Sequence, residues 1–296
     1  MTILEPPVVS IICFAYNHEN YIKETLNGFA MQKTNFPFEI VIHDDASTDK
    51  TADIIREYEK NHPDIFNPIY QVVNQYSLEK GRVTKICYTA ANGKYIALCE
   101  GDDYWIDPLK LQKQVDFLEK NPDYNFSVSA YNTINEKGKV EIGESFKRKK
   151  NTLLIRDYIA KRFSQTSTFL FRNNFELPSW LAEIYAGDQA MLLLAAKDKK
   201  IKYHKEVFSI YRLHSGGIDT LNNNYSERNK KYSFLLENIK SLTGDWKCKV
   251  IISFKIHIIL IKNFGLNTWF EPILKVYTGV MNKLIIPVLN RFLNLI

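Results

Sequence analysis

Apolar residues occur in short runs along the first 131 residues of the chain, and the stretches between these runs have apolar positions at helical spacing. Short apolar runs bounded by turn residues predict buried strands, here at residues 8–14, 38–43, 69–74, 95–99 and 126–131. Apolar positions three or four residues apart predict helices, here at residues 21–30, 50–61, 84–91 and after Asp107-Pro108. Strands that alternate with helices indicate a mostly parallel sheet covered on both faces.

Single residues are expected to mark where these helices begin and end. Asp49 is a suitable N-cap for the second helix. Asp107 followed by Pro108 fits an N-cap and the first position of the fourth helix. Gly93 is expected to end the third helix, since glycine readily takes the left-handed conformation of a helix end.

Negative charge is concentrated directly after the strand at residues 95–99, where Glu100, Asp102 and Asp103 lie within four residues. Like charges at this spacing repel each other, so the cluster indicates a cationic partner. Mg²⁺ and Mn²⁺ prefer carboxylate oxygens, and one or two protein carboxylates often suffice when substrate phosphates complete the shell. In an extended segment Glu100 and Asp102 point the same way, and Gly101 between them lets a ligand approach the backbone. Alternatively, the acids cap the next helix or pair with a lysine.

Polar segments follow three of the predicted strands. They read "AYNHE" at residues 15–19, "HDDASTD" at 43–49 and "EGDD" at 100–103. Ligands of such sheets bind beyond the carboxyl ends of the strands. Two acidic clusters at one edge therefore favour a binding site over simple helix capping.

Composition limits the class of protein. The chain has 296 residues, 45% of them hydrophobic and 24% charged, which fits one large globular domain or one domain with an appendage. Four cysteines without a C-x-x-C pair favour free thiols and a reducing compartment. The first ten residues lack the pattern of a signal peptide, so a cytoplasmic location is expected.

The net charge of +6 comes from the end of the chain. Residues 246–296 hold seven Lys or Arg and one acid, whereas residues 1–245 are neutral as a whole. We expect a domain at 1–245 and a helical tail at 246–296. Apolar stretches interrupted by lysines favour helices lying on a membrane surface over a spanning helix. The alternative is that the tail packs on the domain or forms a homodimer contact. Because the tail is aliphatic, nucleic acid is not an expected partner.

Four segments together resemble glycosyltransferase family 2. They are "VSIICFAYNHENYIKETLNGFAMQ", "EIVIHDDASTDKTADII", "GKYIALCEGDDYWIDPLKLQKQVDFL" and "AGDQAMLLLAAKDKKIKYHKEVFSIYRLHSGG", and they cover about residues 8–217 in the family's order. The resemblance implies an α/β fold of the GT-A type, a Rossmann-like, mostly parallel sheet flanked by helices, here with a C-terminal helical extension. It also implies a nucleotide-sugar donor.

The resemblance implies roles for the residues at the sheet edge. Asp44 or Asp45 would hold the nucleotide base, and the backbone of Ala15 and Tyr16 would line its pocket. Asp102 would bind Mn²⁺ or Mg²⁺ that bridges to the diphosphate. The sequence has "EGD" where the family usually has D-x-D, so Glu100 is expected near either the ribose or the metal. Asp103 would lie behind these ligands or contact the donor sugar.

The later segments supply the expected catalytic groups. The resemblance makes Asp188 the general base; the alternative is that it caps the helix at residues 189–196. It places His214 at the metal or diphosphate, and Arg212 could neutralise phosphate charge. Thr166–Thr168 is where acceptor contacts are expected.

Together these residues predict an inverting, metal-dependent glycosyltransferase. The expected donor is a UDP-sugar, and the expected acceptor is a hydroxyl of a lipid-linked or surface-polysaccharide glycan at the inner face of the cell membrane. A protein that keeps the fold and binds nucleotide sugar without catalysis is the alternative. A nucleotidyltransferase is less favoured, because "FAYNHENY" lacks a glycine-rich phosphate loop.

Overall fold

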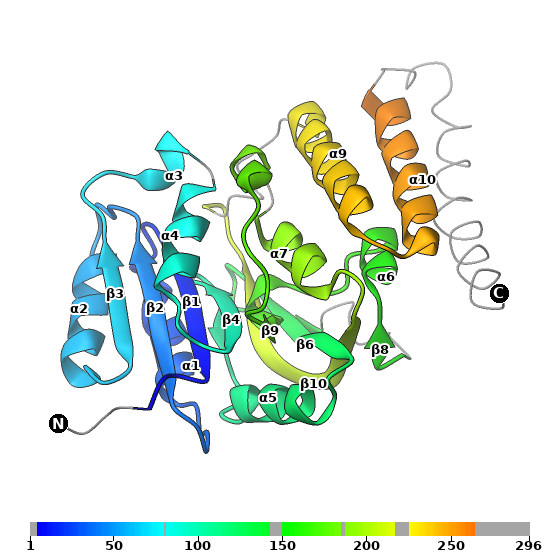
Figure 1. Ribbon diagram of the computed structural model, residues 1–296. Helices are drawn as coiled ribbons and strands as arrows, with labels where there is room; N and C mark the ends of the chain where they lie inside the picture. The colour runs from blue at the N-terminus through cyan, green and yellow to red at the C-terminus, as the bar shows by residue number, and fades with distance from the viewer. Residues whose placement is uncertain (1–4, 80, 143–149, 185–186, 217–224, 264–296) are drawn as a thin grey trace.

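The fold is described by a computed structural model for residues 5–79, 81–142, 150–184, 187–216 and 225–263 (Figure 1). Four parallel strands form the N-terminal half of the sheet, in the order β3-β2-β1-β4. They are β1 (Val9–Ala15), β2 (Phe38–Asp44), β3 (Phe66–Tyr70) and β4 (Tyr95–Glu100). Their carboxyl ends all lie at the top of Figure 1, as the sequence predicts.

The other half of the sheet is mixed. Strand β9 (Leu170–Arg172) lies antiparallel between β4 and β6 (Tyr124–Asn135), and β6 pairs in parallel with β10 (Lys200–Leu213). The short strands β5 (Tyr104–Trp105), β7 (Val140–Ile142) and β8 (Thr152–Leu153) add antiparallel pairs. The prediction of a mostly parallel sheet therefore holds for the first half, while the joining strand β9 runs the other way.

Helices cover both faces of the sheet, and successive strand residues are buried on opposite sides. One face packs against α1 (Ile22–Ala30), α2 (Thr51–Asn61) and α5 (Lys110–Lys120). On the other face α4 (Arg82–Ala90) and α7 (Gly187–Ala196) contact the strands. Helices α6 (Ile155–Ala160), α9 (Tyr225–Leu242) and α10 (Trp246–Asn263) pack on α7 and on one another in the same hydrophobic cluster. Burial on both sides explains why the strands are continuous apolar runs.

The third strand begins earlier than the sequence predicts. Strand β3 covers Phe66–Tyr70 rather than residues 69–74, and Val72 and Val73 are exposed. The ladder with β2 ends where β2 itself ends, at the pair of Asp44 and Tyr70. Beyond that point the chain turns into the short helix α3 (Gln75–Leu78), so apolar character alone did not extend the strand.

Gly93 serves a different purpose from the one expected. Helix α4 ends at Ala90, and Gly93 follows in the approach to β4. A Cβ atom at Gly93 would lie 2.4 Å from the backbone nitrogen of Ser10 in β1. Glycine is therefore required because two backbones pass close to each other, not because of a helix end.

One lysine side chain is fully buried in the protein. Lys110 of α5 is fully buried, its Nζ donates to Gln114 Oε1 at 2.8 Å, and the same atom lies 4.0 Å from the centre of the Trp105 ring. Burial lowers the pKa of Lys110 to about 7. Because the unfolded side chain titrates near 10.4, the unfolded chain binds more protons between these two values, and folding becomes more favourable as the pH rises there.

We therefore expect Lys110→Met to remove one pH-dependent part of the stability. Between pH 7.5 and 9, the free energy of unfolding of the wild type should rise relative to that of the variant by about 1 kcal/mol per pH unit. Urea denaturation at several pH values measures this difference. Lys120→Met, an exposed lysine of the same helix, is the control and should show no such trend. If the free energies of unfolding of Lys110→Met and wild type differ by the same amount at every pH, the prediction is contradicted.

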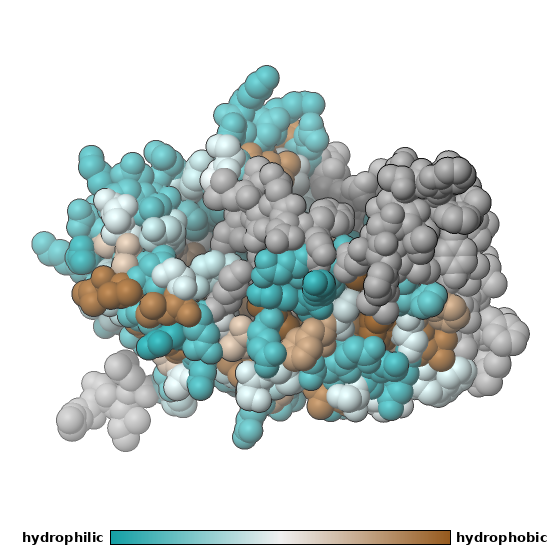
Figure 2. All heavy atoms as spheres, turned by 90° about the horizontal axis from the view of Figure 1, so that it is seen from above, coloured by the Kyte–Doolittle hydropathy of each residue, from teal (hydrophilic) through white to brown (hydrophobic). Residues whose placement is uncertain are grey.

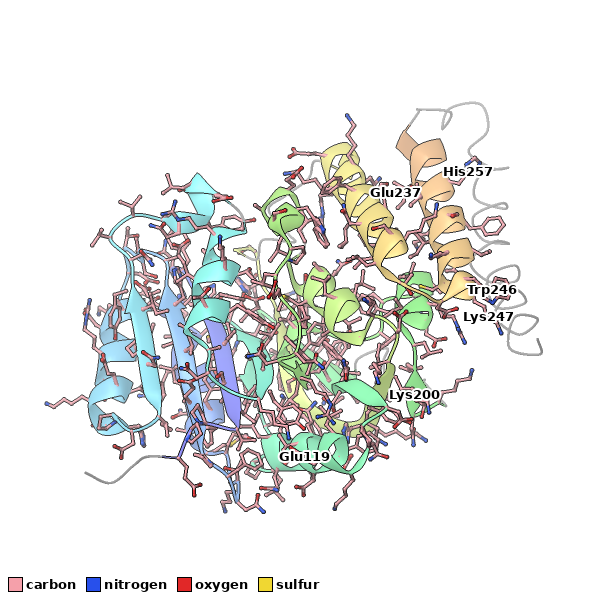
Figure 3. The ribbon with its side chains drawn as sticks, viewed as in Figure 1. Glu119, Lys200, Glu237, Trp246, Lys247 and His257 are labelled. Atoms are coloured by element: carbon pink, nitrogen blue, oxygen red, sulfur yellow. The ribbon has the colours of Figure 1, made fainter. Side chains whose placement is uncertain are left out.

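The first part of the predicted tail belongs to the core. Helix α10 contacts α9 and α6, and an ion pair of 2.9 Å joins Arg156 to Asp245 at its start. Five of its side chains are buried: Cys248, Ile251, Ile252, Ile256 and Ile259. Trp246 and Lys247 lie at its first turn (Figure 3). Among the described helices, none combines the length and apolar character that a membrane span requires. Most of the predicted tail, residues 264–296, lies outside the described residues.

Two truncations should behave differently. Ending the chain at residue 245 removes the five buried side chains of α10, each worth about 1.5–3 kcal/mol, and should leave the protein unfolded or insoluble. Ending it at residue 263 keeps them and should give a folded protein. If residues 264–296 bind a membrane, the protein that ends at residue 263 should move from the membrane fraction of a cell lysate to the supernatant. Unchanged co-sedimentation with membranes would assign that binding elsewhere.

Candidate active site

The loops that follow β1 and β2 are held together by hydrogen bonds. Asn17 Oδ1 accepts from the backbone N–H of Thr48 at 2.8 Å, and the backbone N–H of His18 donates to Thr51 Oγ1 at 2.7 Å. Asn17 and Ala46 have positive φ angles of 54° and 62°. This conformation costs a residue with a Cβ atom about 1 kcal/mol or more. Strain at the carboxyl ends of two neighbouring strands is typical of a binding site.

The two aspartates after β2 have different surroundings. Both carboxylate oxygens of Asp45 accept backbone N–H groups, from Gln75 at 2.6 Å and Tyr76 at 3.0 Å, so Asp45 fixes the start of α3. Asp44 is also buried, and its Oδ2 accepts weakly from the N–H of Ser47 at 3.3 Å. Its Oδ1 is buried and has no partner within the described structure. Of the two, Asp44 has the unused acceptor that a nucleotide base could fill.

The backbone at the end of β1 is partly committed to the fold. The carbonyl of Ala15 accepts the N–H of Asp45 at 2.9 Å, which joins the two loops. Tyr16, the next residue, is half exposed at the edge of the sheet. Ala15 thus joins the loops after β1 and β2, and Tyr16 lies at the surface beside them. That the backbone of this pair lines the pocket of the nucleotide base stays a prediction.

Asp102 lies next to two histidines. Its Oδ2 is 3.0 Å from His214 Nε2 and 3.9 Å from His18 Nε2. Burial alone would raise the pKa of Asp102, but the hydrogen bond with His214 and the nearby His18 together lower it below its usual value. Burial lowers the pKa of His18, although Asp102 opposes this effect. The structure therefore brings Asp102 and His214 together, and adds His18, which the sequence had not singled out.

Asp103 and Arg212 hold each other inside the protein. Asp103 is buried, and its Oδ1 accepts the backbone N–H of Arg212 at 3.0 Å. Burial, and next the neighbouring Asp102, raise the pKa of Asp103 well above its usual value. The Arg212 side chain donates to the carbonyl of Asp102 at 2.7 Å and pairs with Glu24. These contacts hold the end of β10, and with it His214, against the acidic cluster. Because Arg212 already pairs with Glu24, a phosphate would have to compete with Glu24 for its guanidinium group.

Glu100 and Asp188 line the same small pocket, although 88 positions separate them in the chain. The pocket has a volume of about 20 Å³, room for one water molecule or two. Thr166 also lines it, whereas Ser167 and Thr168 are fully buried and hydrogen-bonded inside the protein. Of the three residues expected near an acceptor, only Thr166 therefore faces this pocket.

Asp188 lies in the first turn of α7, beside an arginine that sequence reasoning had not selected. Its Oδ2 accepts from Arg162 Nη2 at 2.8 Å and from Thr166 Oγ1 at 3.4 Å. Both of these partners are side chains rather than amides of the helix. Arg162 and Thr166 thus hold one carboxylate oxygen, Oδ2, in place. Arg162 follows α6, and no motif in the sequence connects it with Asp188.

The residues around Asp102 suit a divalent cation such as Mn²⁺. A carboxylate oxygen and an imidazole nitrogen lie side by side, and both are ligand types that Mn²⁺ accepts. Within the described residues, no three His, Cys, Asp or Glu side chains form a complete metal-binding group. A site with two protein ligands fits a cation whose remaining ligands come from phosphate and water.

Figure 2 shows the molecule from above, on the side where the parallel strands have their carboxyl ends. Hydrophilic residues cover much of this face, and hydrophobic residues form separate small groups on it.

Comparison with known proteins identifies relatives of this chain. Residues 10–176 match the family model described as glycosyl transferase family 2. The uncharacterized protein Rv1520 of Mycobacterium tuberculosis is 36% identical over 75% of this chain and 63% of its own length. An Escherichia coli protein, UDP-Glc:alpha-D-GlcNAc-diphosphoundecaprenol beta-1,3-glucosyltransferase WfaP, is 35% identical over 42% of this chain and 46% of its own. This chain thus spans less than two thirds of the length of these relatives.

Solved structures share the fold. S. aureus TarS residues 1–349 in complex with UDP-GlcNAc superimposes with a TM-score of 0.63, at 18% identity, over 93% of this chain and 76% of that one. The mannosyltransferase PcManGT of Pyrobaculum calidifontis, in complex with GDP-Man and Mn²⁺, gives a TM-score of 0.59 at 15% identity, over 97% and 79%. These similarities confirm the GT-A architecture expected from the sequence.

Proposed function

Because the chain belongs to glycosyltransferase family 2, we propose that it transfers a sugar from a UDP-sugar to a hydroxyl group of a glycan acceptor, with inversion at the anomeric carbon. One observation carries the proposal most: Glu100, beside the expected cation ligand Asp102, and Asp188, the expected base, line one pocket. A transferase needs its leaving-group site and its base on two sides of the same reacting carbon.

The donor would bind across the carboxyl ends of the strands. Asp44 would accept a hydrogen bond from the base through its unpaired Oδ1, while Asp45 holds the adjacent α3 in place. The name of the sequence relative WfaP gives UDP-Glc as its donor, which supports a uracil nucleotide here, and the TarS complexes with UDP and UDP-GlcNAc agree with it. The diphosphate would then extend from β2 past β1 toward Asp102 at the end of β4.

Asp102 and His214 would hold Mn²⁺ or Mg²⁺, as the residue types and their proximity suggest. When bound, the cation would neutralise charge that develops on the departing nucleoside diphosphate. Arg212 and Asp103 would keep His214 in place through the end of β10. Glu100 would lie between this site and the donor sugar, as it lines the pocket.

Asp188 would take the proton from the acceptor hydroxyl as its oxygen attacks the anomeric carbon. Its Oδ1 is the oxygen suited to this step, because Arg162 and Thr166 hold Oδ2. With one base and direct attack by the acceptor, the reaction has a single displacement and inverts the configuration. Thr166, which lines the same pocket, would contact the acceptor or the donor sugar.

A lipid-linked glycan at the inner face of the membrane is the acceptor class that we propose. The name of WfaP gives an acceptor on diphosphoundecaprenol, and WfaP is similar in sequence to part of this chain. The basic, apolar residues near the end of the sequence would bring the protein to such a membrane surface. The truncation at residue 263 tests this location.

A donor screen tests the proposed activity. A panel of UDP-, GDP-, dTDP- and CDP-sugars is offered with Mn²⁺, with Mg²⁺ and with chelator, and binding and release of nucleoside diphosphate are measured. We expect one UDP-sugar to bind most tightly and to release UDP only with the cation and an acceptor extract. Tight binding without any release would instead favour a catalytically silent binding protein. Failure to bind any nucleotide sugar would refute the proposal.

A further inference from the structure

His18 is positioned more firmly than an ordinary loop histidine. Its backbone N–H donates to Thr51 Oγ1 at 2.7 Å, and its carbonyl accepts the N–H groups of Tyr21 and Ile22, both at 2.8 Å, where α1 begins. The main chain of His18 is thus fixed from both sides. The side chain is placed before any ligand arrives, which lowers the entropy that a contact with a ligand would cost.

The glycine of the acidic cluster makes room for this side chain. A Cβ atom on Gly101 would lie 2.7 Å from His18 Nδ1, closer than such atoms come in proteins. The sequence suggested that Gly101 lets a ligand approach the backbone. The structure corrects this, because the space beside Gly101 is filled by the His18 ring. His18 therefore belongs to the acidic cluster sterically, although 83 positions separate it from Gly101 in the chain.

The surroundings of the ring indicate which nitrogen carries the proton. His18 Nδ1 is buried and has no hydrogen-bond partner within the described structure. A buried N–H without an acceptor is rare and costly, so the proton belongs on the other nitrogen. Nε2 lies 3.9 Å from Asp102 Oδ2, and the carboxylate favours an N–H there. A neutral imidazole protonated on Nε2 has no lone pair at that atom to give to a metal.

We propose that His18 donates a hydrogen bond from Nε2 to the terminal phosphate of the nucleoside diphosphate, beside the cation site rather than as part of it. The inference rests on the proposed function, which places the diphosphate next to Asp102. It separates the roles of the two histidines. His214 contacts Asp102 closely and suits the cation, whereas His18 stands back by about one ångström and suits an oxygen of the ligand.

A matched pair of substitutions tests this role. Glutamine and methionine have similar length, but only glutamine retains an N–H donor near the position of Nε2. His18→Met should weaken UDP binding about tenfold in calorimetry with Mn²⁺ present, and His18→Gln should stay within about threefold of wild type. UMP, which lacks the terminal phosphate, should bind both variants as it binds wild type. His257→Met on α10 (Figure 3), an exposed histidine in a different part of the protein, is the control.

Mn²⁺ binding without nucleotide, followed by electron paramagnetic resonance, separates this role from metal ligation. We expect His18→Met to bind Mn²⁺ as wild type does. A loss of Mn²⁺ affinity in His18→Met would overturn the assignment. Equal UDP affinities of His18→Gln and His18→Met, or equal losses of UMP and UDP affinity in His18→Met, would overturn it as well. Thermal unfolding of each variant identifies any loss of affinity that is due to misfolding. If His18→Met is misfolded, His18→Asn replaces it, because the shorter asparagine side chain does not reach the position of Nε2. If wild type binds no UDP at all, the proposed function fails first, and this inference with it.

Discussion

Asp188→Asn should lower sugar transfer by about a thousandfold, because a positioned general base contributes roughly a hundredfold to ten-thousandfold. Asparagine has the size of aspartate and can still accept from Arg162 and Thr166, but it cannot take a proton from the acceptor. Binding of UDP should stay within about twofold, since the nucleotide contacts that we propose lie at the other strand ends. The rate of UDP release, with the donor and acceptor identified by the screen, measures the effect.

Asp64→Asn is the control for this experiment, because Asp64 is an exposed carboxylate in the turn between α2 and β3. It should retain full activity. Transfer that survives in Asp188→Asn at more than a tenth of the wild-type rate would show that another group accepts the proton. Loss of UDP binding in the same variant would show that Asp188 belongs to the donor site instead.

Asp102→Asn is the second large expected effect. It keeps the shape of the side chain and its contact with His214 but removes the negative charge. Charge stabilisation by a bound cation is worth several kcal/mol in a transition state, so transfer should fall by at least about a hundredfold. Mn²⁺ affinity, followed by electron paramagnetic resonance in the presence of UDP, should fall in parallel.

His214→Gln should reduce Mn²⁺ affinity as well, whereas Asp53→Asn, an exposed carboxylate of α2, should leave it unchanged. If Asp102→Asn binds Mn²⁺ like wild type, Asp102 is not the cation ligand. In that case Asp102 would only hold His214 in position, and Asp102→Asn would keep most of the wild-type transfer rate. These outcomes separate a metal-binding role for the cluster from a purely structural one.

Local patterns in the sequence predicted the strands and the acidic edge well. Strands β1, β2 and β4 and helices α1, α2 and α4 lie close to where apolar periodicity placed them, because each buries its apolar side in a sheet covered on both faces. The family match confirms the resemblance carried by the same segments. The site roles inferred from that resemblance remain predictions that the proposed variants test.

Residues whose partners are distant in the chain could not be assigned in this way. Arg212 pairs with Glu24, and Asp188 with Arg162, through contacts that span 188 and 26 positions. Nothing local distinguishes Arg162 from other arginines, or His18 from a surface histidine. The boundary of β3 likewise depended on where its neighbour β2 ends rather than on its own apolar character.

The sequence by itself determined the order of strands and helices, the carboxylates at the strand ends and the family, because these depend on side chains close together along the chain. Only the tertiary structure decided which aspartate after β2 keeps an unused oxygen, which histidines meet Asp102, and that Glu100 and Asp188 share a pocket. The physical reason is that hydrogen bonds and close packing act over a few ångströms. Which groups come within that distance is settled when distant segments fold against one another.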